Sequence, residues 1–491
     1  MLNNSLLRKF SSIRLTEQES KGFAALIEAS EAMGKKTVLR AAGGWVRDKL
    51  LGGESSDIDI ALDNVPGDEF AQFLHDRECS NGNISSIGVV KENPEQSKHI
   101  RTASFRFYGL DFDINNLRSE TYTEHSRIPE VKFAKHPSED AFRRDFTINA
   151  LYYNLNTKEI EDYTGTGLSD LECGIIRTPL PAARTFVDDP LRVLRSIRFA
   201  SRFSFTLDED IKDAWGHEDV RAGLMNKVSR ERIGVEICKM MRDPRAGMAV
   251  EHLLASGLIG LILHPPTDSK APSLAGVSAK DYEDWKKAWA SSDKEEYDRG
   301  SFMSKVNAVQ ARRFLSNTES FYFNTCVLLV ESVKGKASPN AALVARLSLK
   351  LSSADAKAVG NILSSLVQVQ SVFGQVGESA AVSIGRLIRG VLKEHFRAAM
   401  LVYLVSDPSI NEVEMHRKFD SVSSIIAQYS LEGCHEWKPL IDGAEMQKLL
   451  GIKPGKKIQE LLLTEFDMMF AGQRDKATIK DRLIAENDKI V

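Results

Sequence analysis

Residues 43–62 read GGWVRDKLLGGESSDIDIAL, and this stretch decides how the N-terminal part of the chain folds. Its second half alternates acidic and apolar residues, which is typical of a β-strand with two different faces. We expect Ile58 and Ile60 to point into a core, and Asp57 and Asp59 to stand together on the opposite face. Two like charges held so close repel each other unless a cation lies between them. The stretch therefore predicts a divalent metal site with Asp57 and Asp59 as its ligands.

The double glycine at the start of this stretch predicts a phosphate-binding turn. Gly44 allows the backbone to approach a phosphate closely, and the helix expected after Gly43 and Gly44 presents free N–H groups and a positive dipole end. A triphosphate bound there would bring its Mg²⁺ against the two aspartates, and two ions about 3.5–4 Å apart can serve an in-line displacement at phosphorus. Such a site usually has a third carboxylate on a neighbouring strand. Asp113, in the segment FDINNLR, is the first candidate and Asp111 is the second.

The pattern along the chain predicts an α+β fold, with a small mixed β-sheet in a head and an all-helical remainder. Residues 20–33 read as a helix, and the strand segments are KKTVLRAA, SSDIDIAL, TASFRFYGLDFDINNLR with a turn at Gly109, INALYYNL and EIEDY. From about Asp188 onward, apolar residues recur at three- and four-residue spacing. The segment 264–281, HPPTDSKAPSLAGVSAKD, is the best candidate for a linker.

Length and composition limit the remaining choices. A chain of 491 residues is too long for one core, and its composition is that of an ordinary soluble globular protein. The formal net charge of −3 means that any binding of nucleic acid depends on local basic patches. The five scattered cysteines form no CxxC pair, which indicates a reducing compartment. The sequence contains no run of 18 apolar residues, so no membrane span is expected. Residues 1–15 read equally well as a mitochondrial presequence or as a frayed start to the first helix.

A second motif, RRDFTINAL at 143–151, combines arginines with an acid and an amide. If a helix begins here, Asp145 and Asn149 lie one turn apart on one face, where both can bond a ribose hydroxyl. Arg143 and Arg144 supply positive charge for phosphates. Taken alone, the segment also fits a capped helix start with a surface salt bridge.

A third motif, DDPLRVLRSIRFASR at 188–202, predicts a helix with a stripe of arginines, a pattern that suggests bidentate recognition of phosphates or base edges. Asp189 and Arg192 are three residues apart and can face one ligand. A carboxylate accepts from an exocyclic amine while a guanidinium donates to a ring acceptor, so such a pair would accept C and A and reject U and G without a template. The stripe consists of Arg192, Arg195, Arg198 and Arg202.

Together these segments resemble the tRNA CCA-adding nucleotidyltransferases of the eukaryotic and bacterial type, the poly(A) polymerase-like group (class II), and the fungal enzymes in particular. The five motifs that carry the resemblance occur in the family's order over about residues 40–240: GGWVRDKLLGGESSDIDIAL, RRDFTINAL, DYTGTGLSDLECGIIRTPL, DDPLRVLRSIRFASRF and SRERIGVEICKM. The segment from Ser119 to about Ala141 is similar to the family's flexible loop, and GIKPGKKIQELL at 451–462 is similar to its tail.

The resemblance implies a nucleotidyltransferase head at 1–180, a helical neck with the base-reading motif at 181–263, and a helical body and tail that bind tRNA at 264–491. It implies a CTP- and ATP-dependent enzyme with Mg²⁺ as its cofactor, acting on the 3′ end of tRNA and holding its acceptor and T arms. A monomer is expected, cytoplasmic with mitochondrial and nuclear pools. Enzymes adding only CC or only A, a poly(A) polymerase and an inactive RNA-binding protein are the alternatives.

The resemblance also implies a role for individual residues. Asp57 and Asp59 would hold Mg²⁺, with Asp113 as the third catalytic carboxylate. The residues implied in nucleotide binding are Gly43, Gly44, Arg47, Arg143, Arg144, Asp145, Asn149, Asp189, Arg192, Arg195 and Arg198. Among them, Asp189 and Arg192 would read the base, Asp145 and Asn149 would hold the ribose, and Arg47, Arg144 and Arg195 would contact phosphates.

Overall fold

The computed structural model describes residues 13–79, 82, 84, 87–90, 102–123, 126–264, 299–311, 314–332 and 341–489. The chain forms two compact units, one of Met1–Arg232 with Ser256–Leu261, the other of Ile233–Ala255 with Ile262–Val491. The first unit contains all of the expected head, and the finer division into head, neck and body stays a prediction. Most of the candidate presequence, residues 1–12, and nearly all of the candidate linker, residues 265–281, lie outside the described residues.

The first unit is built on a mixed seven-stranded sheet with the strand order β3-β4-β5-β2-β1-β8-β9. The centre of the sheet is the pair β2 and β5, which run parallel, whereas β1 is antiparallel to both of its neighbours, β2 and β8. The predicted strands are thereby confirmed. Their bounds are β1 (Leu39–Ala42), β2 (Asp57–Leu62), β4 (Thr102–Phe107), β5 (Leu110–Asn116), β8 (Leu151–Asn154) and β9 (Glu159–Asp162), and the edge strand β3 (Gly88–Val90) was not predicted.

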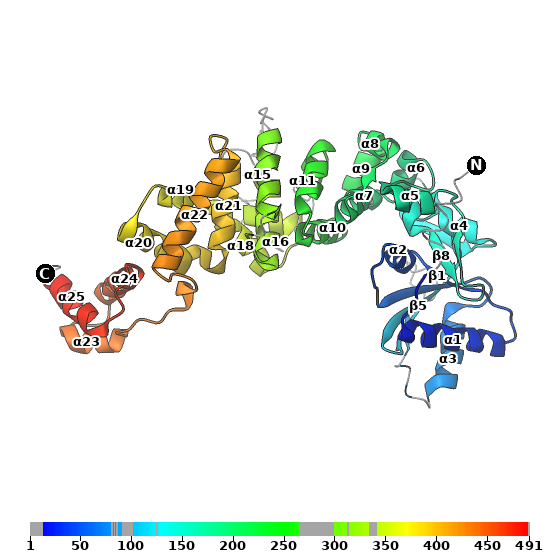
Figure 1. The fold of residues 1–491 in the computed structure, drawn as a ribbon, viewed down its shortest axis with the longest axis horizontal. Helices are drawn as coiled ribbons and strands as arrows, with labels where there is room; N and C mark the ends of the chain where they lie inside the picture. The colour runs from blue at the N-terminus through cyan, green and yellow to red at the C-terminus, as the bar shows by residue number, and fades with distance from the viewer. Residues whose placement is uncertain are drawn as a thin grey trace. The chain divides into compact units, whose positions relative to one another are not determined.

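Strand β2 has the two faces that its alternation predicts. Ile58 and Ile60 are fully buried, and Phe112 of β5 lies beside Ile58 in the parallel register. Helices α1 (Glu17–Ala32) and α3 (Gly67–Glu78) pack side by side on this apolar face (Figure 1). Phe23 of α1 packs edge-on to Phe112, with ring centroids 6.3 Å apart. Because this face is sealed by helices, the alternating carboxylates are left on the other face.

A buried carboxylate joins α1 to α2 (Gly44–Leu50), the helix that follows the double glycine. Glu19 accepts hydrogen bonds from Nε1 of Trp45 at 2.9 Å and from the backbone N–H of Thr16 at 2.7 Å. The Nζ of Lys49 lies 2.9 Å from the same carboxylate. Two residues of α2 are thereby bound to α1, which fixes α2 against the sheet.

The rest of the first unit is mostly helical, as expected from Asp188 onward. The hairpin β6 (Arg118–Thr123) and β7 (Ser126–Phe133) forms a sheet of its own, and β10 (Ile175–Ile176) pairs with β11 (Thr206–Leu207). The other elements are α4 (Pro137–Phe142), the 3₁₀ turn η3 (Thr147–Asn149), α5 (Gly167–Cys173), α6 (Ala182–Asp188), α7 (Leu191–Phe203), α8 (Glu209–Ala214), α9 (Glu218–Asn226) and α12 (Ile259–Ile262); α10 (Arg230–Arg242) begins in this unit and ends in the second.

The second unit is helical throughout its described residues. Its most buried helix, α21 (Phe396–Ser406), packs against helices α15, α16, α18, α19 and α22. No helix in the described ranges is long and apolar enough to cross a membrane. The elements are α11 (Ala246–Ala255), α15 (Arg299–Ala311), α16 (Asn317–Ser332), α17 (Ala341–Leu347), α18 (Ser353–Ser364), α19 (Leu366–Val372), α20 (Gly377–Leu387), η4 (Ile388–Leu392), η5 (Lys393–His395), α21, α22 (Glu412–Gln428), η6 (Cys434–Glu436), α23 (Gly443–Leu450), α24 (Lys456–Phe470) and α25 (Lys476–Lys489).

Candidate active site

Four carboxylates lie on the face of the sheet that faces away from α1 and α3. In the parallel register of β2 and β5, Asp57 is the partner of Asp111 and Asp59 is the partner of Asp113. Asp113 is half-buried, whereas Asp111 is exposed. The structure thus brings both candidates for the third carboxylate to the predicted pair, with Asp113 directly beside Asp59.

The electrostatics of this row favour a bound cation. Burial raises the pKa of Asp57, and the negative charges of Asp113 and Asp111 raise it further. Burial also raises the pKa of Asp59; Arg144 opposes this rise, while Asp113 and Asp57 add to it. Ionising Asp57 and Asp59 is therefore less favourable in the protein alone than in water, and a divalent cation would offset that difference.

The chemistry of the donor atoms fits Mg²⁺. Carboxylate oxygens are hard ligands, and Mg²⁺ is commonly held by one or two carboxylates together with water and substrate phosphates. Among the described residues, no group of three His, Cys, Asp or Glu side chains is arranged to hold a metal ion. Asp57 and Asp59 supply two carboxylates of the kind that hold Mg²⁺ together with water and substrate phosphates.

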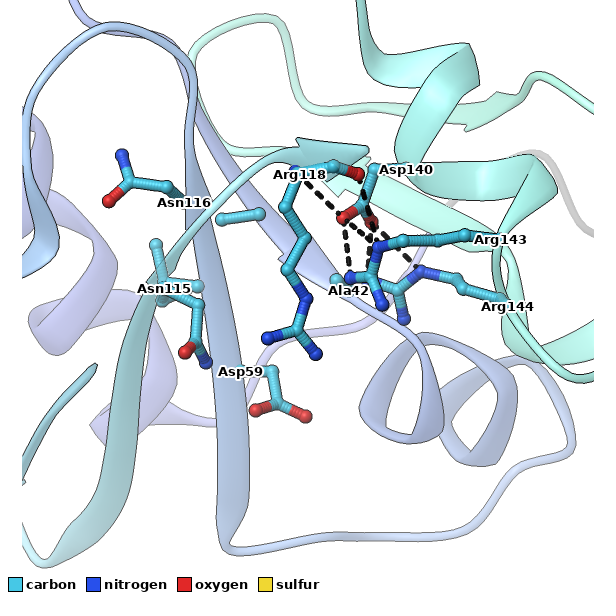
Figure 2. A pocket seen from close by; sticks show the side chains of 10 residues that line it. Ala42, Asp59, Asn115, Asn116, Arg118, Asp140, Arg143 and Arg144 are labelled. Carbon is cyan, nitrogen blue, oxygen red and sulfur yellow. Dashed lines mark hydrogen bonds and ion pairs between the residues drawn. The ribbon is translucent and has the colours of Figure 1, made fainter. Parts of the chain in front are cut away.

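Beside Asp59 is a cavity of about 190 Å³ whose lining is strongly basic. Arg118 is the first residue of β6, and Figure 2 shows its guanidinium extending toward Asp59. Burial lowers the pKa of Arg118, and the positive charge of Arg143 lowers it further. A cavity of this polarity suits a phosphate group. Its lining residues are Ala42, Asp59, Ile60, Ala61, Asn115, Asn116, Arg118, Asp140, Arg143 and Arg144.

The double-glycine turn brings the backbone close to this cavity. Gly43 has a φ of +68°, a left-handed conformation that favours glycine, and it precedes the first residue of α2. A Cβ atom on Gly43 would lie 2.8 Å from Nη1 of Arg144, so a side chain at this position would have to displace the end of Arg144. At Gly44 a Cβ atom would meet only ordinary contact, 3.6 Å from Nη2 of Arg47.

Asp145 and Asn149 come together as predicted, but on a different local structure. The conditional expectation of a helix from RRDFTINAL is wrong: residues 147–149 form the single 3₁₀ turn η3 and strand β8 begins at Leu151. Asn149 Nδ2 nevertheless donates to Asp145 Oδ1 at 2.9 Å, and Arg195 donates to Asp145 Oδ2 through Nε at 2.8 Å and Nη2 at 2.6 Å. The ion pair with Arg195, followed by the bond from Asn149, outweighs burial and lowers the pKa of Asp145.

Arg47 is buried beneath this pair instead of facing solvent. Its Nη1 donates to Oδ1 of Asn149 at 2.5 Å, and its Nε donates to Asp48 at 2.8 Å. Its guanidinium also lies 5.1 Å from the ring centroid of Phe199 and 4.8 Å from that of Phe203, both on α7. The structure therefore gives Arg47 contacts that position Asn149, and a phosphate contact for Arg47 stays a prediction.

The base-reading candidates Asp189 and Arg192 lie at the start of α7. Asp189 Oδ2 accepts from Arg232 Nη2 at 3.0 Å, and Arg192 Nη2 donates to the carbonyl oxygen of Arg143 at 2.6 Å. Within the described residues, no hydrogen bond joins the two side chains to each other. Arg198 lies mostly buried, with its guanidinium 4.2 Å from the ring centroid of Phe199.

Four residues of the site were not predicted from the sequence: Arg118, Asp140, Tyr152 and Arg232. For Asp140, a usable signal existed, since Asp140 precedes Arg143 by three residues and Arg144 by four, the spacing of ion pairs on a helix. Arg118 follows the acidic strand β5 by two residues, which also places it at the site. Tyr152 and Arg232 carry no such signal, because their partners are distant in sequence.

The paired carboxylates on a mixed sheet, beside an arginine-lined cavity, define a nucleotidyltransferase head. Residues 39–177 match the poly A polymerase head domain. The chain is 32% identical to the mitochondrial CCA tRNA nucleotidyltransferase of Saccharomyces cerevisiae, over 93% of this chain and 90% of that one. It is 34% identical to the tRNA nucleotidyltransferase cca1 of Schizosaccharomyces pombe, over 92% of each. The Thermotoga maritima CCA-adding enzyme, solved with tRNA_CCA, shares the fold, with a TM-score of 0.64, 22% identity and 98% coverage of both chains.

The chain therefore belongs to the CCA-adding tRNA nucleotidyltransferase family. The expected family and the α+β fold are both confirmed.

Proposed function

We propose that this protein adds the 3′-terminal CCA to tRNA, from CTP and ATP and without a template, releasing pyrophosphate at each step. The observation that carries the proposal is the row of four carboxylates beside the basic cavity, in a chain that matches tRNA nucleotidyltransferases over more than nine-tenths of its length. A purely RNA-binding protein has no need of carboxylates that repel one another on an open face. The same row therefore argues against the inactive RNA-binding alternative.

Each group of side chains has a part in the reaction. The 3′-hydroxyl of the tRNA attacks the α-phosphate in line and pyrophosphate leaves from the opposite side. Asp57 and Asp59, with Asp113 beside them, hold the divalent ion that enzymes of this family generally need, and we propose that it is Mg²⁺. When bound, this ion lowers the pKa of the attacking hydroxyl and neutralises developing charge. Arg143 and Arg144 bind the phosphates that become the leaving group.

The nucleotide's sugar and base are held by the other two pairs. Asp145 and Asn149 accept and donate at the ribose hydroxyls, with Arg195 beside them for the phosphates. Asp189 accepts from the exocyclic amine of cytosine or adenine, and Arg192 donates to the adjacent ring nitrogen. Uracil and guanine present a carbonyl and an N–H at these positions, so both contacts would be lost.

The test uses purified protein, Mg²⁺ and a tRNA transcript that lacks its last three nucleotides, with CTP, ATP or both. Three additions that then stop support the proposal. A stop after two C residues, or extension only of a tRNA that already ends in CC, would make the protein a specialist. Long runs of A would make it a poly(A) polymerase. The absence of any extension would refute an enzymatic function.

We further propose that part of the protein is mitochondrial, beside cytoplasmic and nuclear pools. Residues 1–15 contain Arg8, Lys9 and Arg14 and no acid, and the S. cerevisiae relative is named as mitochondrial. A fluorescent fusion of the full chain should label mitochondria, and a fusion lacking residues 1–12 should not. Equal labelling by both fusions would contradict this proposal.

A further inference from the structure

Asp140 is the most highly connected carboxylate at the site, although no proposed step uses it. It lies on α4 with 1% of its surface exposed. Its two oxygens have separate partners. Oδ1 accepts from Nε of Arg143 at 2.9 Å, from Nη2 of Arg143 at 2.5 Å and from the backbone N–H of Arg118 at 3.1 Å.

The second oxygen of Asp140 accepts hydrogen bonds from Arg144 in the same way. Oδ2 of Asp140 accepts from Nε of Arg144 at 3.0 Å, from Nη2 of Arg144 at 2.9 Å and from the hydroxyl of Tyr152 at 2.6 Å. Tyr152 also lies under Arg144, with the guanidinium 5.0 Å from its ring centroid. One carboxylate therefore holds two guanidinium groups by their Nε–Nη2 edges, as Figure 2 shows.

This arrangement leaves the outer ends of both guanidinium groups near the cavity. Nη1 of Arg143 donates to Glu120 at 3.0 Å, and Nη1 of Arg144 donates to the carbonyl oxygen of Asn149 at 3.2 Å. Each terminal nitrogen carries two hydrogens, so N–H groups remain for a further acceptor. Both side chains line the cavity that also contains Asp59 and Arg118.

The charge of Asp140 explains how adjacent arginines can share one cavity. Arg143 and Arg144 repel each other, and Arg118 adds a third positive charge. Burial alone would raise the pKa of Asp140, but Arg144 and Arg143 outweigh it and hold this pKa well below its ordinary value. Asp140 therefore stays ionised at neutral pH, and its negative charge compensates the positive charges of the two arginines that it pairs with.

We infer that Asp140 is a positioning residue for the leaving group: it holds Arg143 and Arg144 as a preformed pair of cations that binds the β- and γ-phosphates of either nucleotide. The inference rests on the proposed function. Asp140 touches no substrate, and it acts through the two arginines. Because the triphosphate is common to CTP and ATP, loss of Asp140 affects both nucleotides equally and leaves tRNA binding intact.

The test compares the binding of inorganic pyrophosphate, CTP and ATP to the wild type and to Asp140→Asn, by calorimetry in the absence of tRNA. At metal sites, the hydrogen-bond partners that orient the ligands are typically worth about 10- to 100-fold in affinity, and Asp140 orients Arg143 and Arg144 in the same way. We therefore expect pyrophosphate, CTP and ATP to bind to Asp140→Asn at least about tenfold more weakly, with an unchanged affinity for tRNA.

Two further variants keep this test decisive. Tyr152→Phe removes the hydroxyl that donates to Asp140 and accepts from Nε of Arg144 at 3.2 Å, and it leaves the ring under Arg144. We therefore expect a smaller loss in the same direction, even if Asp140→Asn fails to fold. Glu161→Gln is the matched control, because Glu161 pairs with buried Arg40 at 2.6 Å in the same sheet but does not line the cavity.

Wild-type pyrophosphate affinity in both Asp140→Asn and Tyr152→Phe would overturn the inference. An equal loss of tRNA affinity, or the same loss in Glu161→Gln, would also overturn it, because either result would indicate general disruption. These measurements need no turnover. A wild type that binds pyrophosphate but adds no nucleotide would refute the proposed function and leave the comparison valid.

Discussion

Asp59 and Asp113 are direct partners in the parallel register of β2 and β5, two positions along from the partners Asp57 and Asp111. Both pairs point to the face that no part of α1 or α3 covers. The two pairs differ in burial, since Asp113 is half-buried and Asp111 is exposed. On the basis of this difference we propose Asp113, and not Asp111, as the third catalytic carboxylate.

We therefore expect Asp113→Asn to lower kcat far more than Asp111→Asn does. The loss of a charged group that acts on the reacting phosphate should cost about 100-fold or more, whereas Asp111→Asn should stay within a few-fold of the wild type. Single-turnover addition of C to a shortened tRNA measures both. Equal losses, or a larger loss in Asp111→Asn, would move the assignment to Asp111.

The ribose contact predicts a change in sugar discrimination. Asp145 is held by Arg195 and Asn149, so its carboxylate has a fixed direction. A hydrogen bond to a charged group is worth about 1.5–3 kcal/mol, so Asp145→Ala should reduce the preference for CTP over dCTP at least about tenfold. The ratio of kcat/KM for the two nucleotides is the measurement. An unchanged ratio with a lower overall rate would show that Asp145 has only a structural part.

Replacing Arg232 is expected to change base discrimination, although Arg232 lies on α10 and not on α7. Its bond to Asp189 holds the carboxylate that we propose accepts from the exocyclic amine. We expect Arg232→Gln to raise the incorporation of UTP relative to CTP, measured by competition on a shortened tRNA. Arg230→Gln is the control, because Arg230 lies on the same helix and donates to the carbonyl oxygen of Leu261. A similar rise in both variants would contradict the role of Arg232.

Replacing the two glycines of the turn by alanine should lower the free energy of unfolding by different amounts. Gly43→Ala forces a Cβ onto a left-handed residue, at about 1–2 kcal/mol, and pushes it against Arg144. Gly44→Ala has room for the methyl group and lies at the start of a helix, so it should change the free energy of unfolding little. Denaturant unfolding of both variants checks this. A larger loss of stability in Gly44→Ala than in Gly43→Ala would contradict this prediction, because it would show that position 43 tolerates a side chain better than position 44.

The stability of the protein should depend on pH through Asp140. Its pKa is lowered in the folded state, so its ionised form stabilises the fold above the ordinary value of 3.8, and this contribution is lost as the pH falls below that value toward the lowered pKa. We expect Asp140→Asn to be less stable than the wild type at pH 7, and the difference to narrow below about pH 4. A difference that is constant with pH would mean that Asp140 stabilises the fold by shape alone.

The sequence was most informative where the pattern was local. The alternation in DIDIAL gives both the strand and its two faces, because side chains on a strand alternate without reference to anything else. The alternate carboxylates of β5 also predict which of its faces joins the acidic face of β2, but not the register, because a shift of two residues leaves the same faces together. The arginine stripe of α7 predicts which residues share one face, but not that Arg47 would pack against the phenylalanines of that helix.

The parts that could not be predicted depend on partners far apart in the chain. Tyr152 on β8 meets Asp140 on α4 with η3 between them in sequence, and Arg232 on α10 meets Asp189 with α7, α8 and α9 between them. A helix beginning at RRDFTINAL was the conditional expectation, but only a 3₁₀ turn forms there. Strand β8 begins at Leu151 and pairs with β1 and β9, which ends the helical turn after Asn149. Tertiary pairing thus overrides the local pattern while Asp145 and Asn149 stay together.

The bond from Arg192 to the carbonyl oxygen of Arg143 has a consequence for substrate size. It fastens Arg192, which we propose reads the base, to the backbone of Arg143, which we propose binds the phosphates, so the protein would set the distance between these two subsites. Such a fixed span acts as a length gauge. A nucleotide whose base is displaced from its phosphates, for example by a lengthened sugar linkage, would fail to reach both ends even with the correct hydrogen-bonding edge. The enzyme would then select its substrates by dimension as well as by base.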